Sequence, residues 1–176
     1  MGMRKVALIT DGWRRLFTYA LPAGILQRIR ETGEDVNLYI FNSTGNWSRD
    51  AGYNKAEYNI YNLPNLSDFD GIILELNNIS SPAVLADVIS NAKRSGRPVV
   101  SIANELGDFY YVGIDNYSAM KQVIAHLHEV HDCKKFWLLV GAQGNYESSC
   151  RLQGMLDYAK EHKIKIHKDD IWYGSF

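Results

Sequence analysis

Short apolar runs alternate along the chain with longer segments in which apolar residues recur every three or four positions. The short runs predict buried strands, and the longer period predicts amphipathic helices. Strands are expected at 5–10, 36–41, 71–76, 98–102, 110–114, 136–140 and 171–174. Helices are expected at 18–32, 81–93, 117–130 and 148–162, with a short helix or turn near 55–61. This alternation is typical of an α/β fold with a doubly wound parallel sheet.

Local signals mark where several of these elements begin and end. Ser81 followed by Pro82 predicts a helix start, because serine is a favoured N-cap and proline suits the first helical position. Gly33 predicts the end of the first helix. The segment 42–53 is rich in Asn, Ser, Gly and Asp, which predicts a loop.

The order of elements predicts two lobes of unequal completeness. The strands up to Ile114 suffice for one doubly wound lobe, so we expect a first domain over 1–115. The remaining 116–176 supplies too few elements for a complete second lobe, so we expect a fragment of a longer protein. Strands in such a partial lobe have unpaired edges and open apolar faces, which favours a homodimer.

Composition narrows the classes of partner. The formal net charge of -1 and the pI near 6.5 lack the basic excess that nucleic-acid binding requires, so this segment is not expected to contact nucleic acid. Cys133 and Cys150 stand in unrelated contexts, which predicts free thiols in a reducing compartment. The apolar stretch 6–9 is too short for a signal peptide, and no stretch has a membrane-spanning length. We therefore expect a cytoplasmic protein without a membrane contact.

Motifs of catalysis and metal binding are missing from the sequence. There is no Gly-x-Ser-x-Gly elbow, Walker loop, His-Glu-x-x-His or dinucleotide-binding glycine motif, so we expect no enzyme and no cofactor. The segment 126–133 contains three histidines and a cysteine. On a helix His126 and His128 point in different directions and only His128 and His131 share a face, so no metal site is expected there.

Four segments carry a family resemblance when taken in order. They are 69–73 (FDGII), 96–100 (GRPVV), 112–116 (VGIDN), and 151–155 (RLQGM) with 174–176 (GSF). In this order the chain resembles the ligand-binding core of the lactose-repressor (LacI) family, which has the type I periplasmic-binding-protein fold. The resemblance spans nearly the whole chain. It implies two lobes that close over a sugar, nucleobase or similar metabolite and relay the closure to an output module.

The resemblance also implies which residues contact that effector. These positions are Trp13, Phe17, Tyr19, Asn77, Asp115, Asn145, Glu147, Arg151 and Phe176, with Asn145 and Glu147 in a loop after Gly141. Their chemistry suits a polar metabolite, because aromatic rings offer a platform, arginine a planar fork of donors, and aspartate a charged acceptor. A polar group left unpaired by the wrong ligand costs about 1 to 3 kcal/mol, which provides selectivity.

Structural roles compete with these assignments. Asp115 precedes a predicted helix and could be its N-cap. Arg151 lies four residues after Glu147, a spacing that favours an ordinary surface ion pair. Trp13 and Phe17 could pack in the core, and Asn77 could form a turn after its strand.

Alternatives for the function remain open as well. The DNA-binding helix-turn-helix of LacI repressors does not precede the first strand, so the output module could be a C-terminal enzyme, as in sensors that resemble those of diguanylate cyclases. A flavodoxin-like or Rossmann-like nucleotide enzyme would need a phosphate loop after Thr10, which Asp11-Gly12-Trp13 fits poorly. A module that binds a protein partner through aromatic loops is a third alternative.

Overall fold

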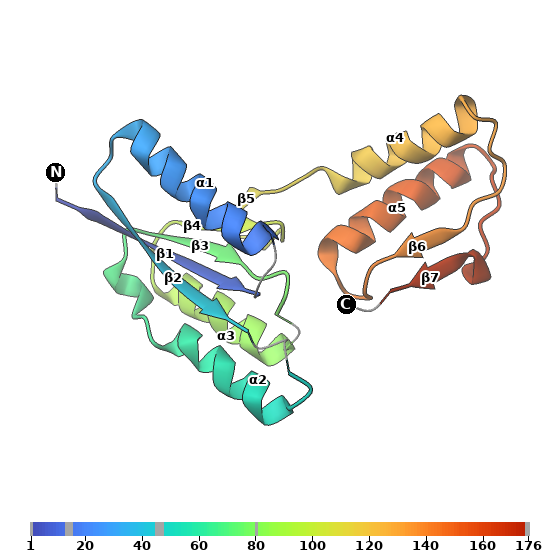
Figure 1. Cartoon of the computed structure of the whole chain (residues 1–176). Coiled ribbons are helices and arrows are strands. Elements are labelled where there is room, and N and C mark those ends of the chain that lie inside the picture. The colour runs from blue at the N-terminus through green and yellow to red at the C-terminus, as the bar shows by residue number, and fades with distance from the viewer. Residues whose placement is uncertain (1, 13–15, 45–47, 80, 175–176) are drawn as a thin grey trace. The chain divides into compact units, whose positions relative to one another are not determined.

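The computed structural model describes residues 2–12, 16–44, 48–79 and 81–174, with the side chains of 16–18 left aside. The chain divides into two compact units, Met1–Val112 (unit 1) and Gly113–Phe176 (unit 2), and Figure 1 shows the elements of each.

Unit 1 is built on a five-stranded parallel sheet with the strand order β2-β1-β3-β4-β5. The strands are β1 (Arg4–Asp11), β2 (Val36–Ser43), β3 (Gly71–Glu75), β4 (Val99–Ile102) and β5 (Tyr110–Val112). In the register, Leu8 of β1 lies between Ile40 of β2 and Ile73 of β3. The predicted doubly wound parallel sheet is thus confirmed, with strand ends shifted by only a few residues.

Helices flank both faces of this sheet. Figure 1 shows α1 on one side and α2 and α3 on the other. The helical elements are α1 (Leu16–Thr32), α2 (Ala51–Glu57), α3 (Pro82–Arg94) and the 3-10 turns η1 (Tyr58–Asn62) and η2 (Leu66–Asp68). On the α3 side, Val88 and Ala92 pack with Ile72 and Leu74 of β3 in one buried cluster. Burial of such side chains is the main source of stability in this unit.

Capping residues determine where two of these helices begin. Ser81 Oγ accepts a hydrogen bond from Val84 N, which confirms the predicted cap of α3. The predicted loop through residue 53 is wrong, because α2 already begins at Ala51. Asp50 Oδ1 accepts hydrogen bonds from the N–H groups of Gly52 and Tyr53, so it satisfies donors that a helix start leaves unpaired.

Unit 2 consists of a helix pair and a two-stranded parallel sheet. Its elements are α4 (Asn116–Glu129), β6 (Leu138–Val140), α5 (Tyr146–Glu161), η3 (Lys168–Asp170) and β7 (Ile171–Tyr173). Leu138, Met155 and Tyr158 belong to the buried cluster between the helices and the sheet. At Gly154 a Cβ atom would lie 2.3 Å from the carbonyl oxygen of Tyr117, so glycine permits the close approach of α5 to α4.

The histidine-rich end of α4 differs from the prediction. Only His128 and His131 were expected to share a face, but the Nε2 atoms of His126 and His131 are 3.1 Å apart. The helix ends at Glu129, and Asp132 has a positive φ of 53°, so the chain turns back and brings His131 over the last helical turn. Among the described residues no three histidine, cysteine or acidic side chains are grouped as metal ligands.

Two other expectations concern the chemistry of the chain as a whole. Cys133 and Cys150 are free cysteines, as predicted. No described helix is long and apolar enough to cross a membrane.

Candidate functional site

Buried polar residues gather at the carboxyl ends of the three strands β2, β1 and β3 in unit 1. Asp11 lies opposite Ser43 in the register of β1 and β2, and Thr10 lies opposite Glu75 of β3. All four residues are buried, with 2 % or less of their surface exposed. Thr10 Oγ1 donates a hydrogen bond of 2.8 Å to the Glu75 carboxylate. This edge is where open α/β sheets bind their ligands.

Neighbouring side chains hold the main chain at the end of β1. Tyr61 Oη donates to the carbonyl of Thr10 at 2.9 Å, and Asn78 Nδ2 donates to the carbonyl of Asp11 at 2.9 Å. Asn42 Nδ2 donates to the carbonyl of Gly12 at 3.0 Å. Side-chain donors from three other segments therefore fix the backbone that carries Asp11, which is the kind of support that keeps a binding site preorganised.

The hydroxyl of Tyr61 at this edge has a changed pKa. Burial raises the pKa of Tyr61 well above its ordinary value, and the nearby negative charge of Asp11 raises this pKa further. The hydroxyl therefore stays protonated at physiological pH and acts as a hydrogen-bond donor.

Two amide oxygens near these carboxylates lack hydrogen-bond partners among the described residues. They are Asn42 Oδ1 and Asn77 Oδ1, and both atoms are buried. Buried polar atoms are nearly always hydrogen-bonded, so unpaired ones call for a specific explanation. Donors of a bound ligand, such as hydroxyl groups, would satisfy both acceptors.

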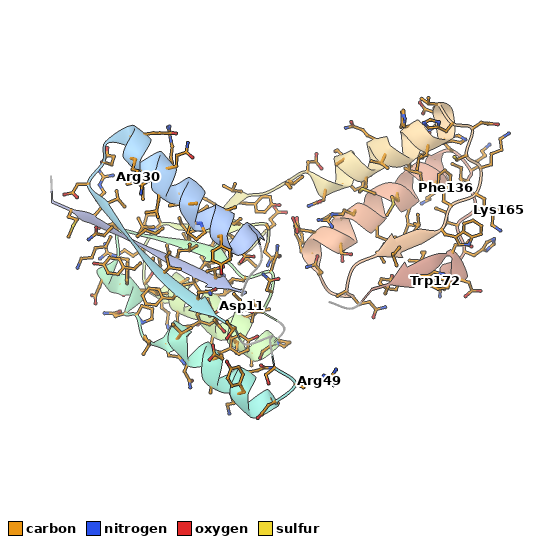
Figure 2. The ribbon with its side chains drawn as sticks, in the orientation of Figure 1. Asp11, Arg30, Arg49, Phe136, Lys165 and Trp172 are labelled. Atoms are coloured by element: carbon orange, nitrogen blue, oxygen red, sulfur yellow. The ribbon has the colours of Figure 1, made fainter. Side chains whose placement is uncertain are left out.

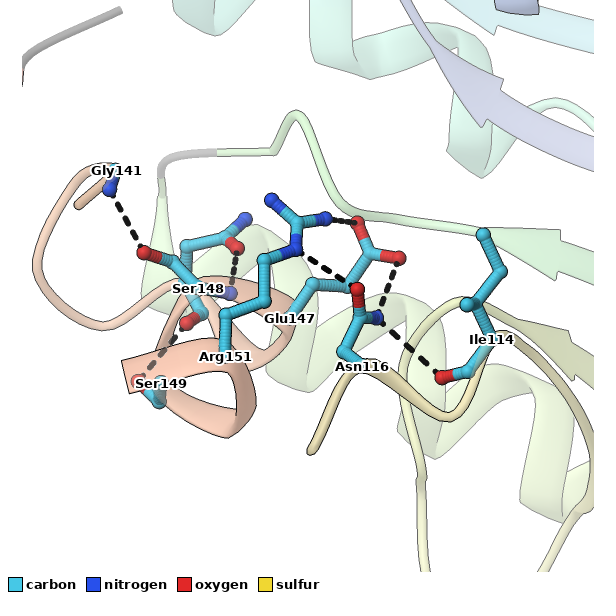
Figure 3. Close-up of polar contacts among 8 residues, drawn as sticks. Ile114, Asn116, Gly141, Glu147, Ser148, Ser149 and Arg151 are labelled. Carbon is cyan, nitrogen blue, oxygen red and sulfur yellow. Dashed lines mark hydrogen bonds and ion pairs between the residues drawn. The ribbon is translucent and has the colours of Figure 1, made fainter. Parts of the chain in front are cut away.

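Unit 2 carries a second polar group, at the starts of α4 and α5 (Figure 3). Arg151 Nε donates to Asn116 Oδ1 at 2.8 Å, and Arg151 Nη2 lies 3.6 Å from Glu147 Oε2. Asn116 Nδ2 donates to Glu147 Oε1 at 3.3 Å and to the carbonyl of Ile114 at 3.3 Å. The three side chains thus form a closed network that joins residues far apart in the sequence.

This network orients a guanidinium group while leaving part of it accessible. Asn116 is buried, whereas 45 % of the Arg151 side chain is exposed. Asn116 and Glu147 occupy only one side of the planar fork, so its remaining N–H groups can donate to a ligand. A guanidinium held in this way suits paired hydrogen bonds to vicinal hydroxyls or to a carboxylate.

The segment between β6 and α5 is ordered by its own side chains. Asn145 Oδ1 accepts a hydrogen bond from Ser148 N at 2.9 Å and caps α5, and Ser148 Oγ accepts one from Gly141 N at 2.9 Å. The predicted loop position of Glu147 is therefore wrong, because α5 begins at Tyr146 and Glu147 lies in its first turn. Asn145 ends the loop as the capping residue.

The other predicted contact residues lie in different surroundings. Asp115 is exposed and caps α4, with its carboxylate accepting from Ser118 N at 2.9 Å. That backbone hydrogen bond lowers the pKa of Asp115. Tyr19 lies in α1 and 63 % of its surface is exposed, and Asn77 lies two residues after the end of β3. Trp13, Phe176 and the side chain of Phe17 lie outside the described part of the chain.

Sequence reasoning missed Asp11, Glu75 and Asn116 as candidate contacts. Glu75 carried a signal, since it is a charged residue inside the apolar run 72–76. Asp11 likewise comes directly after the predicted strand 5–10. Asn116 stands beside Asp115 in the sequence, and only the fold shows that Asn116 is the buried partner of Arg151.

Comparisons with known proteins bear on the fold. No protein-family model matches the chain, and no curated protein matches it either. Among solved structures, the transcription regulator CcpA of Lactococcus lactis aligns with a TM-score of 0.69 and 18 % identity, over 99 % of this chain and 60 % of that one. A periplasmic solute-binding protein of an ABC transporter from Actinobacillus succinogenes, with bound D-allose, aligns with a TM-score of 0.68 and 18 % identity, over 98 % and 58 %.

A third solved structure is named both as a periplasmic binding protein and as a LacI transcriptional regulator. The periplasmic binding protein/LacI transcriptional regulator from Alkaliphilus metalliredigens, complexed with D-xylulofuranose, aligns with a TM-score of 0.67 and 17 % identity, over 98 % of this chain and 56 % of that one. The chain thus spans no more than about 60 % of the length of these matched structures. Within that span, it has the type I periplasmic-binding-protein fold shared by LacI-type regulators and periplasmic sugar-binding proteins.

Proposed function

We propose that the chain is the ligand-sensing domain of a LacI-type transcriptional regulator or a related signalling protein, and that it binds a small polar metabolite such as a sugar or nucleoside. The observation that carries this proposal is the oriented guanidinium of Arg151, held by Asn116 and Glu147 and still half accessible. Two of the matched proteins have a sugar bound, which supports the same ligand class.

The chemistry of the two polar groups suits a ligand rich in hydroxyls. Carboxylates and amide oxygens at the strand ends of unit 1 accept hydrogen bonds, with Glu75, Asn42 and Asn77 as the candidate acceptors. Arg151 in unit 2 donates them. A sugar or ribose hydroxyl both donates and accepts, so such a ligand suits either kind of group. These residues are the proposed ligand contacts, together with the implied aromatic positions Trp13, Phe17, Tyr19 and Phe176.

The proposed role is sensing rather than catalysis, because the matched structures are regulators and solute-binding proteins. A ligand that binds one conformational state more tightly than another shifts the population towards that state. An attached output module can read this shift. In a LacI-type regulator that module binds DNA, and in a diguanylate-cyclase-type protein it is an enzyme, so the two versions of the proposal differ in the output alone.

A thermal-shift screen against sugars, nucleosides and cyclic dinucleotides tests the proposal. A bound ligand at roughly a hundredfold excess over its Kd stabilises the native state by about 2.7 kcal/mol. Arg151→Ala should weaken binding of any hit by about tenfold or more, because it removes an ionic hydrogen bond to the ligand. The control is Lys160→Ala, which removes a positive charge from an exposed position at the other end of α5.

Two results would contradict the proposal. One is a complete panel without any hit. The other is a hit whose affinity Arg151→Ala and Lys160→Ala leave equally unchanged, because the ligand would then bind away from the oriented guanidinium.

A further inference from the structure

Unit 1 contains a polar pocket that the proposed sensing role does not use. It has a volume of about 360 Å³, and its polar lining includes Asn62, Asn65, Ser67, Asn91, Arg94 and Ser95. A volume of this size suffices for a small metabolite. Every lining residue lies within the described part of the chain.

This pocket lies at the opposite edge of the sheet from the buried carboxylates. The turn η2 leads directly into the start of β3, and the carboxyl end of α3 leads into the start of β4. Because these strands are parallel, both segments lie at the amino ends of the strands, whereas Glu75 lies at the carboxyl end of β3. The length of β3 separates the two edges by about 16 Å. Tyr61 is shared between them, but Thr10, Asp11, Ser43 and Glu75 do not line the pocket, so the pocket is a site of its own.

Arg94 supplies the charge of the pocket. Its guanidinium donates to Asn91 Oδ1, a neutral acceptor, and it has no acidic partner among the described residues. The neighbouring cations are already engaged, since Lys93 pairs with Asp108 at 2.5 Å and Arg97 donates twice to the carbonyl of Ser67. Arg94 is therefore the cation that remains available to a ligand there.

Two amides add neutral donors beside Arg94. Asn91 accepts through Oδ1, so its NH₂ group remains free to donate. The side chain of Asn62 is exposed and has no hydrogen bond within the described residues. Tyr61 also lines the pocket, but its hydroxyl already donates to Thr10 O, so it adds no donor.

The carboxyl end of a helix repels anions, so the state of the last carbonyls of α3 matters here. Three of them already accept hydrogen bonds. Ser95 N donates to Asn91 O at 3.1 Å, Ser95 Oγ donates to Ala92 O at 2.6 Å, and Gly96 N donates to Lys93 O at 3.3 Å. These bonds reduce the negative potential of the helix end beside Arg94.

We propose that this pocket is a binding site for a small oxyanion, a phosphate or carboxylate group, held by the guanidinium of Arg94 and the amides of Asn91 and Asn62. Arginine pairs with such groups through parallel charge-assisted hydrogen bonds, and amide N–H groups extend the contact. The lining residues include no carboxylate that would oppose an anion.

The test follows backbone amide NMR shifts of the chain during titration with inorganic phosphate, with ionic strength held constant by chloride. Acetate replaces phosphate in a second arm and distinguishes a carboxylate from a phosphate site, and neutral glucose is used in a third. If the proposal is right, phosphate or acetate shifts the amide signals of residues 61–63, 65–67 and 91–95. Arg94→Ala should weaken that binding by about tenfold.

The matched control is Arg30→Ala, which removes an exposed arginine from the last turn of α1 (Figure 2). It should leave the anion affinity unchanged. The proposal is overturned if Arg94→Ala and Arg30→Ala behave alike, if the shifts follow basic residues over the whole surface, or if glucose alone shifts the pocket. Because Arg94 is exposed and outside the core, its removal is not expected to unfold the chain.

Discussion

Single residues at the helix starts combine a structural with a potential binding role. Asp115 accepts a hydrogen bond from Ser118 N, as an N-cap does, while its exposure leaves the carboxylate accessible. Asn116, the next residue, is buried and holds Arg151. These two neighbouring residues therefore have different roles. Asp115 provides the acceptor that caps the start of α4, and Asn116 provides the acceptor that faces Arg151 of α5.

The cap predicts a pH dependence of stability. The pKa of Asp115 is lowered in the folded chain, so its ionised carboxylate stabilises the fold. This contribution to stability is fully present above the unfolded pKa of about 3.9, and it is lost as the pH falls through the lower pKa of the folded chain. Asp115→Asn should keep the cap, since asparagine also caps well, and remove this acid-dependent part. Urea unfolding at about pH 6 and about pH 3, on either side of the unfolded pKa of about 3.9, measures how much stability each of the two chains loses with acid.

Asp115→Ala is the control for that experiment, because it removes the cap at every pH. If Asp115→Asn lost stability with acid as steeply as the original chain, the carboxylate of Asp115 would not be the titrating group. The same two variants also separate capping from ligand contact, since a cap role alone predicts that Asp115→Asn retains full ligand affinity.

Elements pack according to features that single residues do not reveal. The helices α4 and α5 lie side by side (Figure 1). They are held by a close backbone approach at Gly154 and by polar contacts between their side chains. Tyr117 Oη donates to Asp157 at 3.0 Å, and Lys121 pairs with Glu161 at 2.8 Å. The hydrogen bond to Asp157 raises the pKa of Tyr117, which keeps its hydroxyl a donor. This packing also places Arg151 beside Asn116.

Gly154→Ala should destabilise unit 2 although alanine is the better helix former. The new Cβ would lie 2.3 Å from Tyr117 O, so the two helices must move apart. We expect the free energy of unfolding to fall by about 1 to 3 kcal/mol, the usual cost of overpacking. This is the net loss, which remains after alanine's gain of about 1 kcal/mol in helix propensity is counted.

Gly24→Ala in α1 is the matched control. Nothing lies within 4 Å of the Cβ that this substitution adds, so propensity alone should act and stability should rise slightly. Denaturant unfolding of both variants provides the measurement. Equal effects of the two substitutions would show that the helices of unit 2 do not approach as closely as described.

At the scale of the whole molecule, large apolar side chains are exposed on the two-stranded sheet of unit 2. Trp137, Leu139 and Trp172 are exposed to 66 %, 81 % and 65 %, and they lie on β6 and β7 or directly beside them. Strands alternate their side chains between faces, so the buried Leu138 and Val140 face the helices while Leu139 faces away. An exposed apolar sheet face with open edges favours association.

We therefore predict that the chain forms a homodimer through this face of β6 and β7. Leu139→Lys should shift the chain towards the monomer, because a charge on the apolar face must be desolvated on association. Light scattering coupled to gel filtration measures the mass across a dilution series. Leu63→Lys is the control, since Leu63 is 74 % exposed in unit 1. A stable monomer of the original chain at all concentrations would contradict the prediction.

The sequence by itself determined the secondary structure and the fold class, because strand periodicity, serine and proline at a helix start, and glycine at a helix end act over a few residues. It also identified Arg151, Glu147 and Asn145 as residues of interest. It misplaced the start of α5 and did not predict the contact of His126 with His131, since both depend on how a cap or a turn closes.

Only the tertiary structure decided which polar residues meet. Asn116 and Arg151 are 35 residues apart, and Thr10 and Glu75 are 65 apart, so no local pattern links them. Strand register places Glu75 beside Thr10, and the approach of α5 to α4 at Gly154 places Arg151 beside Asn116. Short-range propensity selects the elements, whereas the burial of apolar faces selects their arrangement, and that arrangement brings distant side chains into contact.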